Sequence, residues 1–379
     1  MVHTVTELMA VLLLIVGFLG ISLLSTTPCS SYTSYVFGDS LVDAGNNDYI
    51  FTLSKADSPP YGLDFAASGG RPTGRFTNGR TIADIVGEAL GEKSFPPPYL
   101  SLSSKNMGRS IFEGVNYASG SSGILDVTGT YFIGRVPLSK QVRYFEQTRK
   151  DMVIAEGEDS TQEFLKEAIF SITIGSNDIL NYLEPSIPFF TDGQKMAPNI
   201  LQDLMVSNLT AHLRRLQQLG GRKFMVNGVG PLGCIPYVRA VMLVFGSRCS
   251  VVANRLVEGY NMKLRKMLEE LHQQLDPDTV FVYGNSYDIF MDIIRNHKLY
   301  GFQNTMDPCC GGSFPPFVCF KGSDANTSSV LCDNRNKYVF WDAYHPTEAT
   351  NVIVADRLLD GDQRSTFPIN MRTLNDLKT

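Results

Sequence analysis

Short apolar runs alternate along this chain with longer segments of helical periodicity. The short runs are 34–38 (SYVFG), 169–175 (IFSITIG), 223–230 (KFMVNGVG), 279–285 (TVFVYGN) and 337–342 (KYVFWD). Their length, their β-branched content and the turn residues that follow them predict buried strands. Elsewhere, apolar residues three and four positions apart predict helices. The helical segments are 201–220, 251–275, 286–296 and 345–359.

Strands that alternate with helices predict an α/β fold, in which a mostly parallel sheet is covered on both faces. Ligands bind such sheets beyond the carboxyl ends of the strands. Polar residues that directly follow a strand are therefore the first candidates for chemistry. Two long loops, 56–80 and 301–336, either form walls of such a site or lie on the surface.

The composition suits a folded protein with a sizeable core. Of the 379 residues, 43% are hydrophobic and 19% are charged, as in ordinary globular domains. The net charge is −5, whereas nucleic-acid-binding proteins usually carry an excess of basic residues. We therefore expect no nucleic-acid partner.

The N-terminus carries an uncharged apolar run, 8–24, followed by small residues. This pattern predicts a secretory signal peptide over 1–29, and hence a protein that is secreted to the extracellular space. Glu7 stands where signal peptides carry a basic residue, so an uncleaved membrane anchor is the alternative. No second such run follows, and we expect no membrane span once the signal is removed.

Cysteines and sequons agree with export. Six of the seven cysteines lie in the C-terminal half, at Cys234, Cys249, Cys309, Cys310, Cys319 and Cys332. An even number in an exported chain predicts disulfides, with Cys234 and Cys249 closing a short loop. Neighbouring cysteines rarely bond each other, which leaves two pairings for the last four. A zinc site is the alternative, although C-x-x-C pairs are missing.

The seventh cysteine, Cys29, lies near the expected cleavage region. Two N-x-S/T sequons, at Asn208 and Asn326, predict glycosylation in the secretory pathway.

Ser40 lies within VFGDSLVDAGNN (36–47), directly after the first predicted strand. A serine nucleophile needs a base, normally histidine, and a third group that orients the base. His345 follows a strand and a short turn, and Asp342 precedes it by three residues, so the two side chains share one side. The other histidines lie before the signal run, within helices or at a helix end; they are His3, His212, His272 and His297.

Asp39 is adjacent to Ser40, but we do not expect it to be the catalytic acid. Successive residues leaving a strand point to opposite sides, so Asp39 should turn away from the cleft and hold the turn through backbone N–H groups. An oxyanion needs hydrogen-bond donors. The candidates are the Ser40 N–H, the Asn177 amide in TIGSND, and Gly120 in NYASGSSG, where backbone can approach a ligand closely.

Several motifs of other enzymes are missing. The chain has no G-x-S-x-G elbow, which argues against an ordinary α/β-hydrolase. It also lacks H-E-x-x-H, a P-loop, and a G-x-G-x-x-G that opens a helix. We therefore expect no metal and no organic cofactor.

Four segments resemble the plant-type GDSL (SGNH) esterase/lipase family in content and order: FGDSLVDAGNN, GVNYASG, TIGSNDIL and WDAYHPTE. The resemblance covers about residues 32–360. It implies a flavodoxin-like three-layer α/β/α sandwich with a mostly parallel five-stranded sheet. We expect one SGNH/GDSL hydrolase domain at 30–365 and a C-terminal tail at 366–379.

The family's signature residues correspond to Ser40, Gly120, Asn177 and His345, and Asp342 completes the triad. Where the family has Ser-Gly-Gly, this chain has Ser119-Gly120-Ser121 and keeps the first glycine.

The resemblance implies a serine hydrolase that cleaves carboxylic esters through an acyl-enzyme, acting on a small-molecule, lipid or polymer ester. Acyl transfer by the same triad is an alternative. A non-catalytic cell-wall or defence protein is a second one, which the intact catalytic set disfavours. No separate apolar lid is apparent, which favours short or medium acyl groups.

Overall fold

The computed structural model describes residues 32–102, 107–184, 196–246, 248–312, 319 and 331–378. The expected signal peptide, Cys29 and the Asn326 sequon lie outside the described residues. Six of the described strands form one sheet in the order β2-β1-β3-β4-β5-β8. They are β1 Ser34–Gly38, β2 Val115–Asn116, β3 Ile169–Thr173, β4 Lys223–Asn227, β5 Val280–Gly284 and β8 Thr366–Phe367.

Neighbouring strands from β2 to β5 are parallel, and β8 is antiparallel to β5. The predicted mostly parallel sheet is confirmed, with six strands in place of five. Gly38, Thr173, Asn227 and Gly284 are successive partners across β1, β3, β4 and β5. These strands therefore end together, and the residues that follow them meet at one edge of the sheet.

Segment 337–342 forms the predicted strand, but this strand lies outside the main sheet. Its strand β7 (Tyr338–Phe340) pairs instead with β6 (Asn304–Pro308) in a separate two-stranded sheet. The cysteine-rich segment after β6 continues this contact, because Cys309 N donates to Phe340 O. The apolar run is thus buried by a local partner. The two-residue strands β2 and β8 are too short to stand out as apolar patterns.

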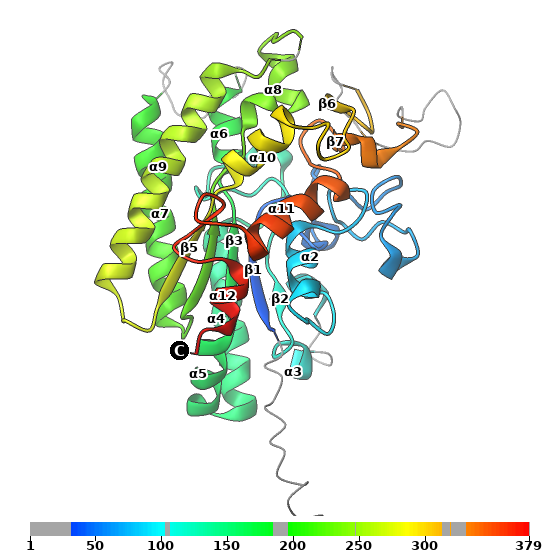
Figure 1. The fold of residues 1–379 in the computed structure, drawn as a ribbon. Coiled ribbons are helices and arrows are strands. Elements are labelled where there is room, and N and C mark those ends of the chain that lie inside the picture. Colours follow the sequence, from blue (N-terminus) through cyan, green and yellow to red (C-terminus); the bar gives the residue numbers. More distant parts are fainter. Residues whose placement is uncertain are drawn as a thin grey trace, which may run out of the picture. The chain divides into compact units, whose positions relative to one another are not determined.

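Helices cover both faces of the main sheet (Figure 1), as expected for a three-layer sandwich. One face carries α4 (Leu138–Glu156), α7 (Pro198–Gln218) and α9 (Val251–Gln274), and the other carries α2 (Ile82–Ala89), α11 (Glu348–Asp360) and α12 (Met371–Asp376). The remaining α-helices among the described residues are α3 Met107–Ser110, α5 Glu158–Glu167, α6 Ser176–Leu183, α8 Pro236–Val241 and α10 Ser286–Arg295.

Three disulfides link the six C-terminal cysteines. Cys234 bonds to Cys249, as predicted. Of the two pairings left open by the sequence, the structure has Cys309–Cys332 and Cys310–Cys319. The last four cysteines surround the buried Trp341, which directly follows β7.

Residues 366–379, expected to be a tail, belong to the fold as far as they are described. They form β8 and α12, and the side chains of Met371 and Leu374 are buried. The buried ammonium group of Lys223 donates to Leu377 O at 2.5 Å and pairs with Glu167 at 3.0 Å. A buried cation needs such partners, so the C-terminus completes the sheet edge.

Among the described residues, no helix is long and apolar enough to cross a membrane. The Asn208 side chain is exposed on α7, where its amide donates to Leu204 O.

Leu374→Ala should lower the free energy of unfolding by about 2–5 kcal/mol, because it leaves a cavity under α12. The matched control is Leu299→Ala, at a side chain that is 85% exposed, which should change stability by less than about 0.5 kcal/mol. Urea denaturation measures both. Equal effects of the two substitutions would show that the C-terminus does not contribute to the core.

Candidate active site

The first strand brings Ser40 to the carboxyl edge of the sheet. At the end of β1, a Cβ atom on Gly38 would lie 2.4 Å from Thr173 O, so only glycine fits there. The Gln141 side chain binds both the N–H and the C=O of Gly38, at 2.9 and 2.8 Å. Asp39 N then donates to Thr173 O at 3.1 Å. The chain is therefore fixed on both sides just before it turns through Ser40.

Asp39 holds this turn, as its sequence position predicts. Its Oδ1 accepts the Leu41 N–H at 3.1 Å, and its buried Oδ2 has no partner among the described residues. Burial raises the pKa of Asp39 to about 7. Although part of the residue lines the cavity described below, its carboxyl group is bonded to the turn rather than to His345.

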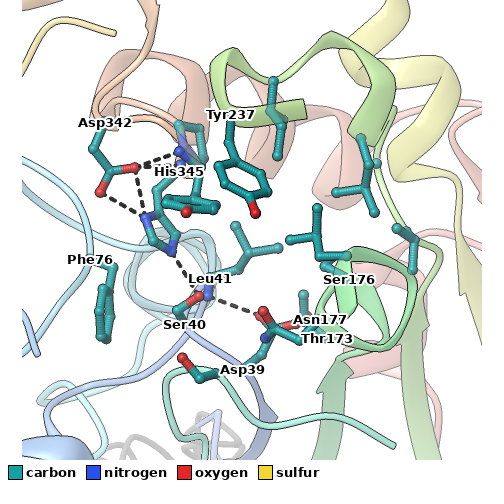
Figure 2. A pocket seen from close by; sticks show the side chains of 18 of the residues that line it. Asp39, Ser40, Leu41, Phe76, Thr173, Ser176, Asn177, Tyr237, Asp342 and His345 are labelled. Carbon is teal, nitrogen blue, oxygen red and sulfur yellow. Dashed lines mark hydrogen bonds and ion pairs between the residues drawn. The ribbon is translucent and has the colours of Figure 1, made fainter. Parts of the chain in front are cut away.

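Ser40, His345 and Asp342 form one hydrogen-bonded line (Figure 2). His345 Nε2 lies 2.7 Å from Ser40 Oγ, and His345 Nδ1 lies 2.8 Å from Asp342 Oδ2. Asp342 Oδ1 also accepts the backbone N–H groups of Tyr344 and His345, each at 2.8 Å. Burial alone would raise the pKa of Asp342, but His345 and these hydrogen bonds hold it below its usual value.

Tyr61 is a member of the site that the sequence did not indicate. Its hydroxyl donates to Asp342 Oδ2 at 2.8 Å. From the same loop, the Phe76 ring packs on the His345 ring with 5.1 Å between their centroids. Loop 56–80 thus forms a wall of the site, which settles one of the open alternatives. No motif singled out Tyr61, because its partner lies 281 residues away.

Gly120 lies beside the site, but its N–H is occupied. It donates to Asp43 Oδ2 at 2.9 Å. A Cβ on Gly120 would lie 2.7 Å from both the Asn47 amide and the Phe76 ring, so close packing requires this glycine. The next residue, Ser121, has a φ of 63° and lines the cavity. No hydrogen-bond acceptor for the Ser121 N–H is found among the described residues.

Asn177 lies in the first turn of α6, beyond the end of β3. One N–H of its amide donates to Ser122 O at 2.9 Å, which leaves the other available. Asp178 fixes this helix start to the neighbouring loop, since its carboxylate accepts Ile124 N and Leu125 N at 2.9 and 3.0 Å. Burial raises the pKa of Asp178 to about 6.

The residues after Ser40 in the same motif connect the turn at Ser40 to the Gly120 segment. Asp43 Oδ1 accepts Gly45 N and Asn46 N, each at 2.7 Å. The Asn46 amide donates to Asn116 O and Ala118 O. Burial raises the pKa of Asp43 to about 7. These polar residues have a structural role, because they bind backbone groups of the two loops. In the sequence, the high density of polar residues in the motif is the signal that could have indicated this role.

Ser40, Asn177 and His345 face a cavity of about 250 Å³. Much of its wall is apolar and comes from Leu53, Leu180, Val229, Leu232, Ile235 and Phe290. The arrangement places a serine hydroxyl, an imidazole and hydrogen-bond donors beside room for an apolar group. Among the described residues, no group of three or more His, Cys, Asp or Glu side chains is placed to hold a metal ion.

A family model described as GDSL-like lipase/acylhydrolase matches residues 35–358. Three GDSL esterase/lipases of Arabidopsis thaliana are similar to the chain over most of both lengths. One is 60% identical over 93% of this chain and 96% of its own length. The others are 46% and 45% identical over 91% of this chain, and over 91% and 88% of their own lengths.

Asp39→Asn should make stability less sensitive to pH. The pKa of about 7 lies above the ordinary value near 4, so the folded protein keeps a proton that the unfolded chain loses. Wild-type stability therefore falls as the pH rises from about 4 to 7, by up to about 1.4 kcal/mol per unit of pKa difference. Asparagine resembles the neutral acid and does not titrate, so the stability of the variant relative to wild type should increase as the pH rises.

Urea denaturation at pH 5 and pH 8 measures this difference. Asp57→Asn, at an exposed carboxylate, is the control for the loss of one charge. A stability difference between Asp39→Asn and wild type that stays constant from pH 5 to pH 8 would contradict the raised pKa.

Proposed function

The chain belongs to the GDSL-like lipase/acylhydrolase family, and from this membership we propose that it hydrolyses carboxylic esters through an acyl-enzyme formed on Ser40. The observation that carries the proposal is the line of contacts from Ser40 Oγ through His345 to Asp342, at 2.7 and 2.8 Å. This is the arrangement that a serine nucleophile requires.

In the first half-reaction, Ser40 Oγ attacks the carbonyl carbon while His345 Nε2 takes the hydroxyl proton. Asp342 keeps the imidazole oriented and stabilises its positive charge. The tetrahedral intermediate then collapses, the bond to the alcohol oxygen breaks, and His345 returns the proton to the leaving alcohol. Water repeats the sequence on the acyl-enzyme, which releases the acid and restores Ser40. No metal or organic cofactor takes part.

We assign the oxyanion to three donors: the Ser40 N–H, the free N–H of the Asn177 amide, and the backbone N–H of Ser121. Ser121 replaces Gly120 in this assignment, since the Gly120 N–H is bonded to Asp43. Support for Ser121 comes from its place on the cavity wall and its positive φ. Gly120 contributes by allowing the close packing of Asn47 and Phe76.

We also propose that residues 1–29 are a signal peptide and that the protein is secreted. The three disulfides support this, because such bonds persist in oxidising compartments. Glycosylation at Asn208 is supported by its exposure, and glycosylation at Asn326 stays a prediction from the sequon. Acyl transfer to an alcohol uses the same triad, and product analysis with an added alcohol distinguishes it from hydrolysis.

Ser40→Ala should lower kcat on a soluble p-nitrophenyl ester by about 10⁴-fold or more, because the acyl-enzyme cannot form. Ser286→Ala changes another serine on the cavity wall and should keep kcat within a few-fold of wild type. Turnover by the Ser40 variant near the wild-type rate would rule out the proposal.

Asn177→Ala should lower kcat by about 100-fold to 1,000-fold, because one donor to the oxyanion is lost. The Michaelis constant should change little, since the negative charge develops only in the transition state. Melting temperature serves as the control for the lost bond to Ser122 O. An unchanged kcat in a folded variant would remove Asn177 from the oxyanion site.

A further inference from the structure

Two neighbouring surface segments expose large apolar side chains beside the cavity. They include the 3-10 helices Asn46–Tyr49 and Thr130–Phe132. We call the exposed side chains the apolar rim, and they are Tyr49, Phe51, Leu53, Val127, Tyr131 and Ile133. Phe51 is 80% exposed and Leu53 is 67% exposed. Single exposed apolar residues are ordinary, but a contiguous group on a soluble protein usually marks an interaction site.

The two segments are held together and lead directly into the cavity. Leu53 N and Thr52 Oγ1 both donate to Phe132 O, at 3.0 and 3.2 Å. Leu53, Tyr131 and Phe132 also line the cavity that contains Ser40. The apolar rim is therefore continuous with the apolar wall of the cavity.

Ile133 has a backbone conformation that β-branched residues rarely adopt, with φ 73° and ψ −69°. Glycine would take this conformation without strain. The strained residue instead holds an apolar side chain that is 56% exposed. Strain of this kind concentrates at functional sites, so the exposure of Ile133 points to a role outside the folded core.

The charges beside the apolar rim do not favour an anionic partner. Lys55 Nζ donates to Asp48 O at 3.2 Å and pairs with Asp57 at 3.4 Å. Arg135 donates to the backbone carbonyl of Thr128. With a net charge of −5 for the whole chain, the surface matches a neutral apolar phase better than a negatively charged membrane.

We propose that the apolar rim seats the enzyme on the aggregated phase of a neutral, water-insoluble ester. An acyl chain then passes from that phase into the cavity without crossing water, and the burial of the rim side chains supplies the attraction. This inference rests on the proposed function and extends it to substrates with longer acyl chains. It differs from the expectation of short or medium chains, which was based on a missing lid.

The test compares hydrolysis of an emulsified neutral triacylglycerol, tricaprylin, with hydrolysis of dissolved p-nitrophenyl acetate. Phe51→Ser combined with Ile133→Gly removes two rim side chains and relieves the strain. The matched control is Ile154→Ser combined with Leu299→Ser, because these side chains are 83% and 85% exposed outside the rim. The rim variant should hydrolyse the tricaprylin emulsion about tenfold or more slowly than wild type. Its kcat/KM on the dissolved ester should stay within about twofold of the wild-type value.

Flotation with the emulsion separates binding from turnover. Ser40→Ala should float with the tricaprylin droplets, and the same variant with both rim substitutions should not. Equal flotation and equal emulsion hydrolysis by the rim variant and the control would overturn the inference. Binding that requires anionic lipid vesicles, or a rim-dependent dimer in sedimentation, would also overturn it. Wild-type protein that floats with the droplets but hydrolyses neither ester would instead contradict the proposed function.

Discussion

The hydrogen bond between Ser40 Oγ and His345 Nε2 joins residues that lie 305 positions apart in the sequence. Its length of 2.7 Å depends on two independent supports. Gly38 and Gln141 fix the end of β1 before Ser40. Asp342 fixes His345 through its ring and its backbone N–H. Proton transfer needs heavy atoms within hydrogen-bond distance, so the proposed transfer from Ser40 to His345 depends on both supports.

Buried carboxyl groups have two different roles around this bond. Asp39, Asp43 and Asp178 accept backbone N–H groups in the surrounding loops, and burial raises the pKa of each to about 6 or 7. Asp342 is equally enclosed, yet His345 keeps its pKa below the usual value. The three carboxyl groups with raised pKa values hold loops, and the one with a lowered pKa is bonded to the His345 ring. The hydrogen-bond partners of a buried carboxyl group therefore indicate its role better than its position in a motif. Asp39, Asp43 and Asp178 accept backbone N–H groups, whereas Asp342 also contacts the His345 ring.

The local sequence pattern is enough to predict strand β1, the position of Ser40 directly after it and the contact between Asp342 and His345. Each of these features depends only on residues that are close in sequence. Segment 337–342 forms a strand as its pattern predicts, but its pairing with β6 could not be predicted, since β6 carries no strong apolar pattern. Tyr61 and the Asp43–Gly120 contact were missed because their partners lie 281 and 77 residues away. Such contacts exist only after the chain has folded, and no spacing rule reveals them.

We propose that Ser40 is the residue that becomes acylated, with His345 as its base. Reaction with a fluorophosphonate, followed by mass spectrometry of the intact protein and of its peptides, identifies the residue that reacts. We expect one adduct per chain, on the peptide that contains Ser40, and a strong loss of labelling in His345→Gln. Labelling at another residue, or undiminished labelling of Ser40 without His345, would contradict it.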